Sequence, residues 1–393
     1  MSGSLQHRFP ALAGPAGMWA RFDGPSGTQM VDSAISAVHD WMLSGQTAAV
    51  GGPFEAAQQC QELLDITRVT LGQLFNADPR GFSFGPNTTT NNMAMANAIS
   101  ETLRPGDRVV GTKLDHDSNV MPWRRACERS GAEQVLADFD PLTGVLDSAS
   151  VIALIDERTR WVTLPAASNL LGTMPHLEPI ISHAHAVGAY VYVDAVAAAP
   201  HHTIDIAGLD CDVLVTSPYK WYGPHCGVIW CRPELMAELD IWRVRPAGDS
   251  GPRKFETGMP NFEAIAGTQA AARFLIEEDM GQLAEYESQV FSRLWDGLGN
   301  IAGVRRIGPS DGQLRAPTAA FVIADRDPAQ ISARLAAEKI ALWDGHAYAV
   351  EVVEHLGLAS RGGVIRAGVV RYIENDDVDR LLDAIGRCCH SKK

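Results

Sequence analysis

The chain has 393 residues, 46% of them hydrophobic and 20% charged, and this composition excludes a disordered or fibrous protein. Its formal net charge is −14 and no run of Lys or Arg reverses that sign locally, so neither nucleic acid nor a membrane surface is an expected partner. The seven cysteines form no CxxC pair, which argues against a disulfide framework or a zinc site, and no metal is predicted. Without a signal sequence or a long apolar stretch, the chain is expected to be cytoplasmic.

Helical and strand periodicities alternate from about residue 54, which is typical of a sheet with crossover helices. The predicted helices of this part cover residues 55–75, 122–131 and 178–188. Short apolar runs predict buried strands at residues 108–112, 161–167, 189–196, 211–217 and 227–232. Successive βα units favour a mostly parallel α/β sheet, which binds ligands at the carboxyl ends of its strands. The chemistry is therefore expected at the strand ends.

A second αβ pattern follows in the last third of the chain. A long helical pattern over residues 264–298 precedes strands near 319–324 and 364–370 and a final helix over 376–388. This pattern predicts a smaller C-terminal α/β domain. The expected division is an N-terminal segment, 1–25, that packs on the small domain, a large domain, 26–266, and the small domain, 267–393.

Two polar residues follow neighbouring predicted strands. Asp194 ends the apolar run VYVD, and Lys220 comes 26 residues later, after the run DVLVTS. Such a pair suits pyridoxal phosphate, because the amine forms a Schiff base with the aldehyde and the carboxylate pairs with the pyridinium nitrogen. Burial would lower the pKa of the lysine toward that of a nucleophilic amine. A surface lysine in a turn and a strand-capping aspartate remain the alternative interpretation.

Three further strand ends carry polar residues. Asn87, Thr88 and Thr89 stand where a strand gives way to a helix, and such groups bind phosphate, although N-capping explains them equally well. His116 follows the next strand, where it would lie over an aromatic ring and titrate near neutral pH, or simply be solvated. Asn169 would donate a hydrogen bond to a phenolic oxygen or a carboxylate, or it would have only a structural role in a turn.

Seven motifs occur in order along nearly the whole chain: TTT, LDHDSN, SNLLGT, VDA, SPYKWYGP, FETGMPN and IRAG. This ordered set resembles the fold-type I pyridoxal phosphate enzymes of the class V aminotransferase and cysteine desulfurase family. It is most similar to the cysteine desulfurase-like branch. The resemblance implies pyridoxal 5'-phosphate as cofactor, an amino acid as substrate and a homodimer with a shared active site.

The resemblance also implies a role for each matching residue. Lys220 would hold the cofactor, Asp194 would pair with its pyridinium nitrogen, and His116 would stack on its ring. Asn169 would lie near the phenolic oxygen and the substrate carboxylate, which Arg366 would bind with its planar guanidinium unless it forms a surface ion pair. The implied phosphate-binding residues are Thr88, Thr89, Ser217 and Tyr219, the last in place of the more usual His.

The chain departs from the family pattern at three places. Residues 341–365 contain no cysteine, whereas the desulfurases carry their sulfur on a loop cysteine shortly before the carboxylate arginine, so true desulfurase activity is not expected. Cys388 and Cys389 are interpreted as surface thiols. Ala197 stands where the family has a Gln or His beside the phenolic oxygen, and the smaller side chain either admits a bulkier substrate or reflects local repacking. Met259 stands where the family usually has a Thr that reaches the phosphate bound in the neighbouring subunit.

These departures favour a carbon–sulfur β-lyase that converts an S-substituted cysteine to a thiol, pyruvate and ammonia. Lys220 would be the base and His116 would supply a proton to the leaving sulfur. The alternatives are decarboxylation coupled to oxidative deamination of a similar substrate, an epimerase or aminotransferase, and an inactive homologue that serves as a scaffold. Enzymes of this type act on S-conjugated cysteines in lincosamide pathways, so a secondary-metabolism substrate is one expectation.

Overall fold

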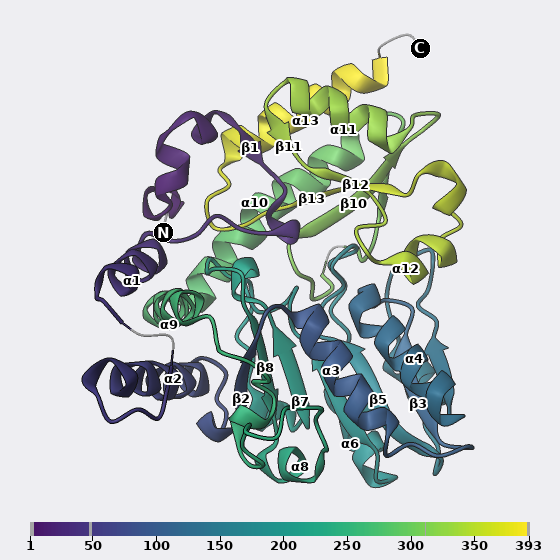
Figure 1. The fold of residues 1–393 in the computed structure, drawn as a ribbon. Helices are drawn as coiled ribbons and strands as arrows, with labels where there is room; N and C mark the ends of the chain where they lie inside the picture. Colours follow the sequence, from purple (N-terminus) through teal and green to yellow (C-terminus); the bar gives the residue numbers. More distant parts are fainter. Residues whose placement is uncertain (1–3, 47–48, 311, 391–393) are drawn as a thin grey trace.

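The computed structural model describes residues 4–46, 49–310 and 312–390, so the extreme ends of the predicted terminal segments lie outside the described residues. Two parts lie one above the other in Figure 1. We call the lower part, built around a seven-stranded sheet, the large domain, and the upper part, built around a four-stranded sheet, the small domain.

The large sheet has the strand order β2-β8-β7-β6-β5-β3-β4. Its strands are β2 (Phe82–Gly85), β3 (Arg108–Thr112), β4 (Glu133–Ala137), β5 (Thr159–Pro165), β6 (Tyr190–Asp194), β7 (Val213–Thr216) and β8 (Gly227–Cys231). Only β8 is reversed among these strands, because it pairs antiparallel with β2 and β7 while the other pairs are parallel. The carboxyl ends of the remaining strands therefore meet at one edge of the sheet.

Strand β6 illustrates why this sheet is buried on both faces. Val191 and Val193 belong to one apolar cluster, and Tyr192 between them packs into another. Successive side chains of a strand point to opposite faces, so an unbroken apolar run requires helices on both sides. The helices of the large domain are α1 (Asp32–Leu43), α2 (Glu55–Leu74), α3 (Thr88–Ser100), α4 (Met121–Ser130), α5 (Ser148–Ile152), α6 (Glu178–Ala186), α7 (Ile206–Leu209), α8 (Pro233–Glu238) and α9 (Phe262–Glu277).

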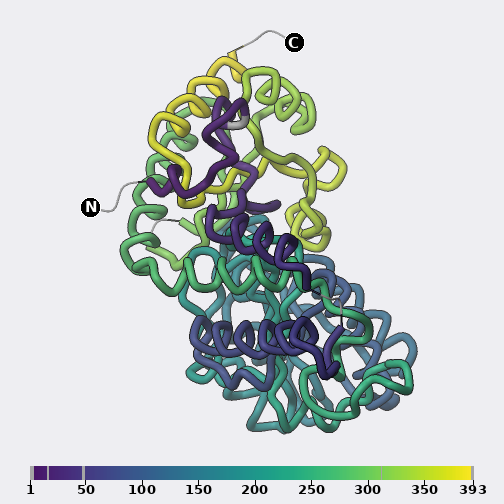
Figure 2. Tube along the Cα trace, turned by 60° about the vertical axis from the view of Figure 1, so that its left-hand side comes forward, coloured from purple at the N-terminus to yellow at the C-terminus, as the bar shows by residue number. Residues whose placement is uncertain are grey.

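The small domain contains an antiparallel sheet in the order β12-β13-β10-β9. Its strands are β9 (Val304–Ile307), β10 (Thr318–Ile323), β12 (Trp343–Gly345) and β13 (Val364–Gly368), and its helices are α10 (Met280–Asn300), α11 (Pro328–Ala337), α12 (Val350–His355) and α13 (Asn375–His390). The N-terminal segment joins this domain, since β1 (Ala20–Arg21) pairs in parallel with β11 (Ile340–Ala341). Figure 1 and Figure 2 both show the purple N-terminal segment against the yellow C-terminal elements.

The structure confirms the predicted fold, an α/β protein with a mostly parallel sheet, flanking helices and a smaller C-terminal domain. The helical pattern over residues 264–298 is divided between α9 and α10. Glu278 adopts an extended conformation there, and Asp279 caps α10 by accepting a hydrogen bond from the N–H of Gln282 at 3.1 Å. The predicted boundary at residue 266 falls inside α9, and this helix packs against α1 and α2. The division of the chain into domains stays a prediction.

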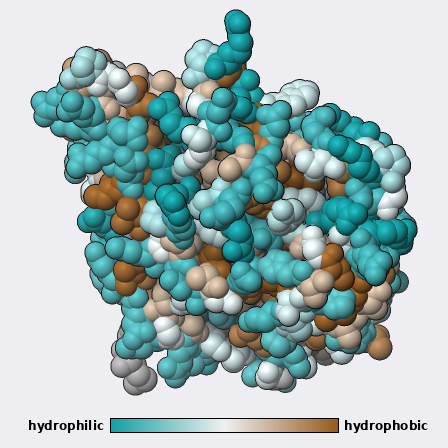
Figure 3. Space-filling model, turned by 90° about the horizontal axis from the view of Figure 1, so that it is seen from below, coloured by the Kyte–Doolittle hydropathy of each residue, from teal (hydrophilic) through white to brown (hydrophobic). Residues whose placement is uncertain are grey.

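The face of the large domain in Figure 3 is mainly hydrophilic, with hydrophobic residues in separate groups. Trp242 and Val244 are among the exposed apolar residues of the molecule. Across the described ranges, no helix combines the length and the hydropathy that a membrane span requires.

Candidate active site

Lys220 ends the short 3-10 helix Pro218–Lys220, which follows β7 at the carboxyl edge of the sheet. Its ammonium group donates a hydrogen bond to the carbonyl oxygen of Pro25. Burial and the charge of Arg366 lower the pKa of Lys220 to about 7, although Asp194 acts in the opposite direction. A large fraction of this amine is therefore unprotonated and nucleophilic at neutral pH.

Asp194 is the last residue of β6 and is only 7% exposed. Its Oδ1 accepts a hydrogen bond from the N–H of Val196 at 2.9 Å. Burial raises the pKa of Asp194 to about 6, while that hydrogen bond and the charge of Lys220 oppose the rise. The carboxylate is thus mostly ionised at pH 7, and it acts electrostatically on the lysine at the next strand end.

Helix α3 begins beside the lysine. Its first residue, Thr88, donates to the carbonyl oxygen of Thr216 at 3.0 Å, and its hydroxyl oxygen lies 2.7 Å from that of Ser217. Thr88 and Ser217 are buried, whereas Thr89 is exposed at the same helix end. Free N–H groups and hydroxyls at a helix N-terminus are the groups that bind phosphate in proteins.

His116 follows β3 and caps the short 3-10 helix Asp117–Asn119. Its Nδ1 accepts a hydrogen bond from the N–H of Ser118 at 3.1 Å, which leaves the ring proton of the neutral form on Nε2. Burial, together with the charges of Lys220 and Arg366, lowers the pKa of His116 to about 4. The expectation that His116 titrates near neutral pH is therefore wrong, and a neutral imidazole is a poor proton donor at pH 7.

Tyr219 packs face to face with His225, with ring centroids 5.0 Å apart and planes inclined by 10°. The ammonium nitrogen of Lys220 lies 5.0 Å from the centre of the Tyr219 ring. His225 is exposed and stands just before β8, at the same edge of the sheet. The sequence analysis missed His225, and its position next to a strand end is the one signal that points to it.

Arg366 reaches the site from β13 of the small domain and is 4% exposed. Its Nη1 donates to the backbone carbonyl oxygen of Asn169 at 2.8 Å, and its Nη2 donates to the hydroxyl of Ser26. Both partners are neutral. Burial lowers the pKa of Arg366 to about 10, so the guanidinium remains charged at pH 7. A buried cation without a hydrogen-bonded carboxylate in the described part of the chain is suited to an anionic ligand.

Asn169 connects this arginine to the small-domain loop. Its Nδ2 donates one of its two N–H groups to the carbonyl oxygen of Ala347 at 2.7 Å, and the same nitrogen carries a second N–H for the predicted donation to a ligand. Its Oδ1 is buried and has no hydrogen-bond partner among the described residues. A buried oxygen of this kind is costly unless a donor reaches it, and the side chain therefore offers an acceptor to a bound molecule.

Residues 23–31, which we call the strap, lie along the lysine loop. The N–H of Thr28 donates to the carbonyl oxygen of Tyr219 at 2.9 Å, and its hydroxyl accepts from the N–H of Tyr222 at 2.9 Å. The strap also supplies Pro25 to Lys220 and Ser26 to Arg366. These contacts join residues about 195 and 340 positions apart, so no local sequence pattern indicates them.

A buried network behind His116 was also missed. Asp115 is 1% exposed, and its carboxylate accepts from the hydroxyl of Thr112 at 2.5 Å and from Nδ2 of Asn119 at 2.7 Å. Burial raises the pKa of Asp115 well above its ordinary value. The network ties the end of β3 to the 3-10 helix that carries His116 and so fixes its backbone.

The segment FETGMPN is anchored by its glutamate. Glu256 pairs with Arg68 at 2.7 Å and accepts from the N–H of Phe84 at 3.2 Å, and both charged side chains are buried. Thr257 and Met259 remain exposed. Ala197 is partly buried against the main apolar cluster.

The cysteines offer no reactive thiolate near the lysine. Cys226 precedes β8 at the same sheet edge, but burial raises its pKa to about 12 and its thiol donates to the carbonyl oxygen of Gly85 at 3.6 Å. The interpretation of Cys388 as a surface thiol is wrong, because that side chain is buried in the apolar core, and Cys389 is partly buried. Apolar packing of one face of α13 explains the difference.

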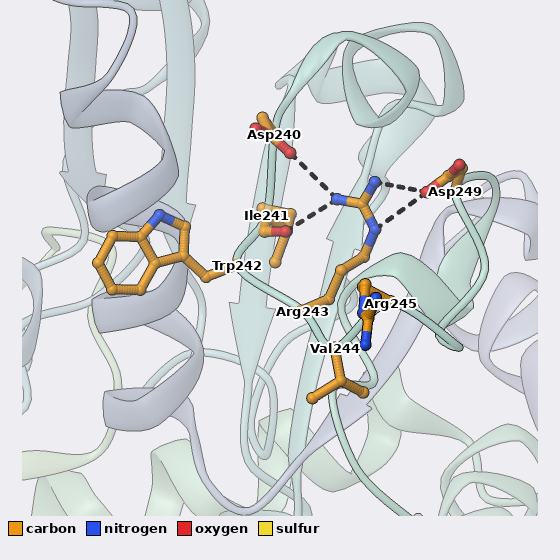
Figure 4. A pocket seen from close by; sticks show the side chains of 7 residues that line it. All are labelled: Asp240, Ile241, Trp242, Arg243, Val244, Arg245 and Asp249. Atoms are coloured by element: carbon orange, nitrogen blue, oxygen red, sulfur yellow. Dashed lines mark hydrogen bonds and ion pairs between the residues drawn. The ribbon is translucent and has the colours of Figure 1, made fainter.

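A cavity of about 560 Å³ lies along residues 240–249, and none of the candidate site residues described in this section lines it. Figure 4 shows Arg243 between two acids: Nη1 donates to Asp240 at 3.1 Å and Nη2 to Asp249 at 2.6 Å, while Trp242 points away from them. Two carboxylates therefore already neutralise the guanidinium of Arg243 in this cavity.

Comparisons with known proteins place this chain in a family. The family model for class V aminotransferases matches residues 21–381 of this chain. The chain belongs to the class V aminotransferase family. It is 27% identical over 388 residues to a cysteine desulfurase of Salmonella agona, covering 94% of this chain and 93% of that one. It is 30% identical over 382 residues to the uncharacterized protein MT3887 of Mycobacterium tuberculosis, and the match covers 93% of this chain and 94% of that protein.

Solved structures agree with this family membership. The cysteine desulfurase CsdA of Escherichia coli superposes with a TM-score of 0.87 at 26% identity, covering 97% of this chain and 96% of CsdA. A C-DES variant with glycine covalently linked to its pyridoxal phosphate has a TM-score of 0.80 at 19% identity, covering 97% and 98%, which shows a shared fold. This class V family member is a pyridoxal phosphate enzyme of fold type I, and the predicted cofactor and family are confirmed.

The residues described above fit that cofactor. A nucleophilic amine, an ionised carboxylate and buried hydroxyls at a helix N-terminus converge at one sheet edge, and Asn169 offers an acceptor without a partner in the described chain. These are the groups that an aldehyde, a pyridinium nitrogen, a phosphate and a phenolic hydroxyl require.

Proposed function

We propose that this enzyme is a carbon–sulfur β-lyase that acts on an S-substituted cysteine. The observation that carries the proposal is the loop before Arg366, which presents Tyr348 to the site and has no cysteine. The relatives named as cysteine desulfurases support cleavage of a carbon–sulfur bond in this family. A lyase needs the lysine and the carboxylate site of those enzymes but no protein thiolate to accept sulfur.

Lys220 is assigned two tasks. As the free amine favoured by its pKa of about 7, it binds pyridoxal phosphate covalently, and when released it removes the α-proton of the substrate. Asp194 would pair with the pyridinium nitrogen, and the phosphate would be held by Thr88, Thr89, Ser217 and Tyr219. When bound, the cofactor supplies an electron sink for the pair released at the α-carbon.

Arg366 and Asn169 are assigned to the substrate. The buried guanidinium binds the α-carboxylate, and Oδ1 of Asn169 accepts a hydrogen bond from the bound amino acid or the phenolic hydroxyl. This arrangement orients the α-proton and the β-carbon before Lys220 acts. His116 packs on the cofactor ring as a neutral imidazole, and the proton for the leaving sulfur comes from another donor.

The reaction balances without a redox partner. The α-proton goes to Lys220, the bond between the β-carbon and sulfur breaks, and the sulfur leaves with the electron pair and takes up a proton as a thiol. Addition of one water to the remaining unsaturated amino acid yields pyruvate and ammonia. No sulfur is transferred to the protein.

Product analysis tests this proposal. The purified holoenzyme is incubated with a panel of cysteine S-conjugates and, in parallel, with free cysteine, and the products are identified by mass spectrometry. We expect free thiol, pyruvate and ammonia from at least one conjugate, and no alanine. Alanine with protein-bound sulfur from free cysteine, or an aldehyde that retains its carbon–sulfur bond with release of carbon dioxide, would contradict the lyase assignment, and the second outcome would favour decarboxylation.

We also propose that the enzyme is a homodimer. Trp242 and Val244 are 67% and 63% exposed, and Met259 on the neighbouring segment is 58% exposed. Large exposed apolar side chains of this kind are often covered by a partner subunit. Sedimentation equilibrium should give a dimer that Trp242→Asp weakens, whereas a monomer for the unmodified protein would contradict the proposal.

A further inference from the structure

The loop between β12 and α12 has an unusual backbone. Ala347 and Tyr348 have φ angles of 46° and 61°, and Gly345 before them has 94°. Residues with a Cβ atom rarely adopt this left-handed region, and two in succession persist only where surrounding contacts hold them. Backbone strain of this kind clusters at functional sites, so the contacts that hold the loop and the side chain it presents are informative.

Hydrogen bonds on both sides of the Tyr348 peptide hold the loop. The carbonyl oxygen of Ala347 accepts from Nδ2 of Asn169 at 2.7 Å, and the carbonyl oxygen of Tyr348 accepts from the N–H of Asp117 at 2.7 Å. The N–H of Tyr348 donates to Nδ1 of His346 at 2.9 Å. The first two bonds come from residues that follow β5 and β3 of the large domain, so a loop of the small domain is fixed to two strand ends.

The strained backbone sets Tyr348 against His116. The two rings stack with centroids 5.4 Å apart and planes inclined by 22°, and the tyrosine is otherwise 66% exposed. Tyr348 therefore covers one face of the imidazole. His116 is held in its own plane by the hydrogen bond from Ser118, so the tyrosine adds a constraint from outside the large domain.

We propose that Tyr348 is a positioning residue that acts through His116. Its ring sets the plane of the imidazole against which the pyridine ring of the cofactor packs, and Asn169 links the same loop to the substrate carboxylate site through Ala347 and Arg366. The inference rests on the proposed packing of His116 on the cofactor. It does not depend on which carbon–sulfur bond is cleaved.

Three variants of the holoenzyme test the proposal: Tyr348→Leu, Tyr348→Phe and, as a matched control, Tyr190→Leu, which changes another partly exposed tyrosine at the start of β6. The readouts are the visible circular dichroism of bound pyridoxal phosphate, which reports the setting of its ring, and the affinity for glycine, measured from the change in cofactor absorbance. Thermal unfolding checks that the variants fold.

Stacked aromatic pairs contribute modestly, so Tyr348→Leu should change the visible dichroism and weaken glycine binding roughly threefold to tenfold. Tyr348→Phe keeps the ring and should remain within about twofold of the parent, as should the control. In a His116→Ala background, Tyr348→Leu should have no further effect, since the tyrosine acts through the histidine.

Unchanged dichroism and glycine affinity in Tyr348→Leu would overturn the proposal, as would equal losses in the Phe and Leu variants or additive losses in the His116→Ala background. These spectroscopic results stand apart from the product analysis. Failure of the lyase assignment appears as wrong products from the parent enzyme, whereas failure of this inference appears as an unresponsive cofactor signal in the variants.

Discussion

The two domains contribute to the site in different ways. The large domain supplies Asp194, Lys220 and Thr88 at successive strand ends, where burial and strand geometry fix them. The small domain supplies Arg366 from a buried strand. It also supplies the loop at Ala347 and Tyr348, whose backbone is in the left-handed region and is held there by contacts with the large domain. The proposed cofactor-binding residues are thus positioned by the large sheet, and the proposed substrate-binding residue Arg366 is positioned by contacts between the two domains.

This difference has a chemical consequence. A sheet edge suits a cofactor that stays bound throughout turnover, whereas Arg366, in its proposed role, would exchange its contacts with Ser26 and Asn169 for the carboxylate of the substrate. Changes in the large-domain half should therefore abolish cofactor attachment. Changes in the small-domain half should leave attachment intact and act on substrate binding.

The largest effect is expected at Lys220. Lys220→Ala should lose covalently bound cofactor and at least about 10³-fold in activity, because both the attachment point and the base are removed. Borohydride reduction and peptide mapping of the parent should locate the pyridoxyl group on Lys220, with Lys113→Ala as a control that behaves like the parent. An adduct on Lys113 or Lys254 would break the assignment.

Arg366→Ala should have the next largest effect. The cofactor spectrum should be unchanged, while kcat/KM falls about 10- to 150-fold, the range expected for a lost charge-assisted pair of about 1.5–3 kcal/mol. Arg361→Ala, an exposed arginine of the same domain, serves as the control. Parent-like kinetic constants for Arg366→Ala would mean that the arginine is structural and that the comparison of the two halves is wrong.

Cofactor attachment should depend on pH through the lysine. The pKa of Lys220 is lowered to about 7 and its free amine is the reactive form, so the attachment rate to the apoenzyme should rise with pH and reach half its maximum near pH 7. Below pH 6 protonation of Asp194 should weaken binding further. Stopped-flow absorbance measures this rate, and a midpoint near the ordinary lysine value of about 10.4 would contradict the burial argument.

The smallest effect is expected for substitutions of the two adjacent threonines at the start of α3. Thr88→Val removes a buried hydroxyl from Thr216 and Ser217 and should weaken pyridoxal phosphate binding roughly 2- to 10-fold, equivalent to about 0.5–1.5 kcal/mol. Thr89 is exposed, and Thr89→Val should cost less. Equilibrium dialysis of the apoenzymes gives both dissociation constants. A larger loss of affinity in Thr89→Val than in Thr88→Val would mean that Thr89, and not Thr88, makes the main contact with the phosphate.

The placement of Asp194 and Lys220 at neighbouring strand ends could be predicted from the sequence because it depends on local patterns. Apolar runs and parallel topology bring Asp194 and Lys220 to one edge without any knowledge of side-chain contacts. The strap at Pro25 and Ser26 and the stacking of Tyr348 on His116 were not predicted, since each joins distant segments. The depressed pKa of His116 was missed for the same reason, because its cause is burial beside charges from two other elements.

The most direct test of the central claim is a mass balance of one turnover reaction with a cleavable cysteine S-conjugate. Pyruvate, ammonia, free thiol and alanine are quantified together, and the intact protein is weighed by mass spectrometry for added sulfur. The account predicts equal amounts of pyruvate, ammonia and thiol, with no alanine and no gain in protein mass. Alanine formed in step with sulfur bound to the protein would contradict it.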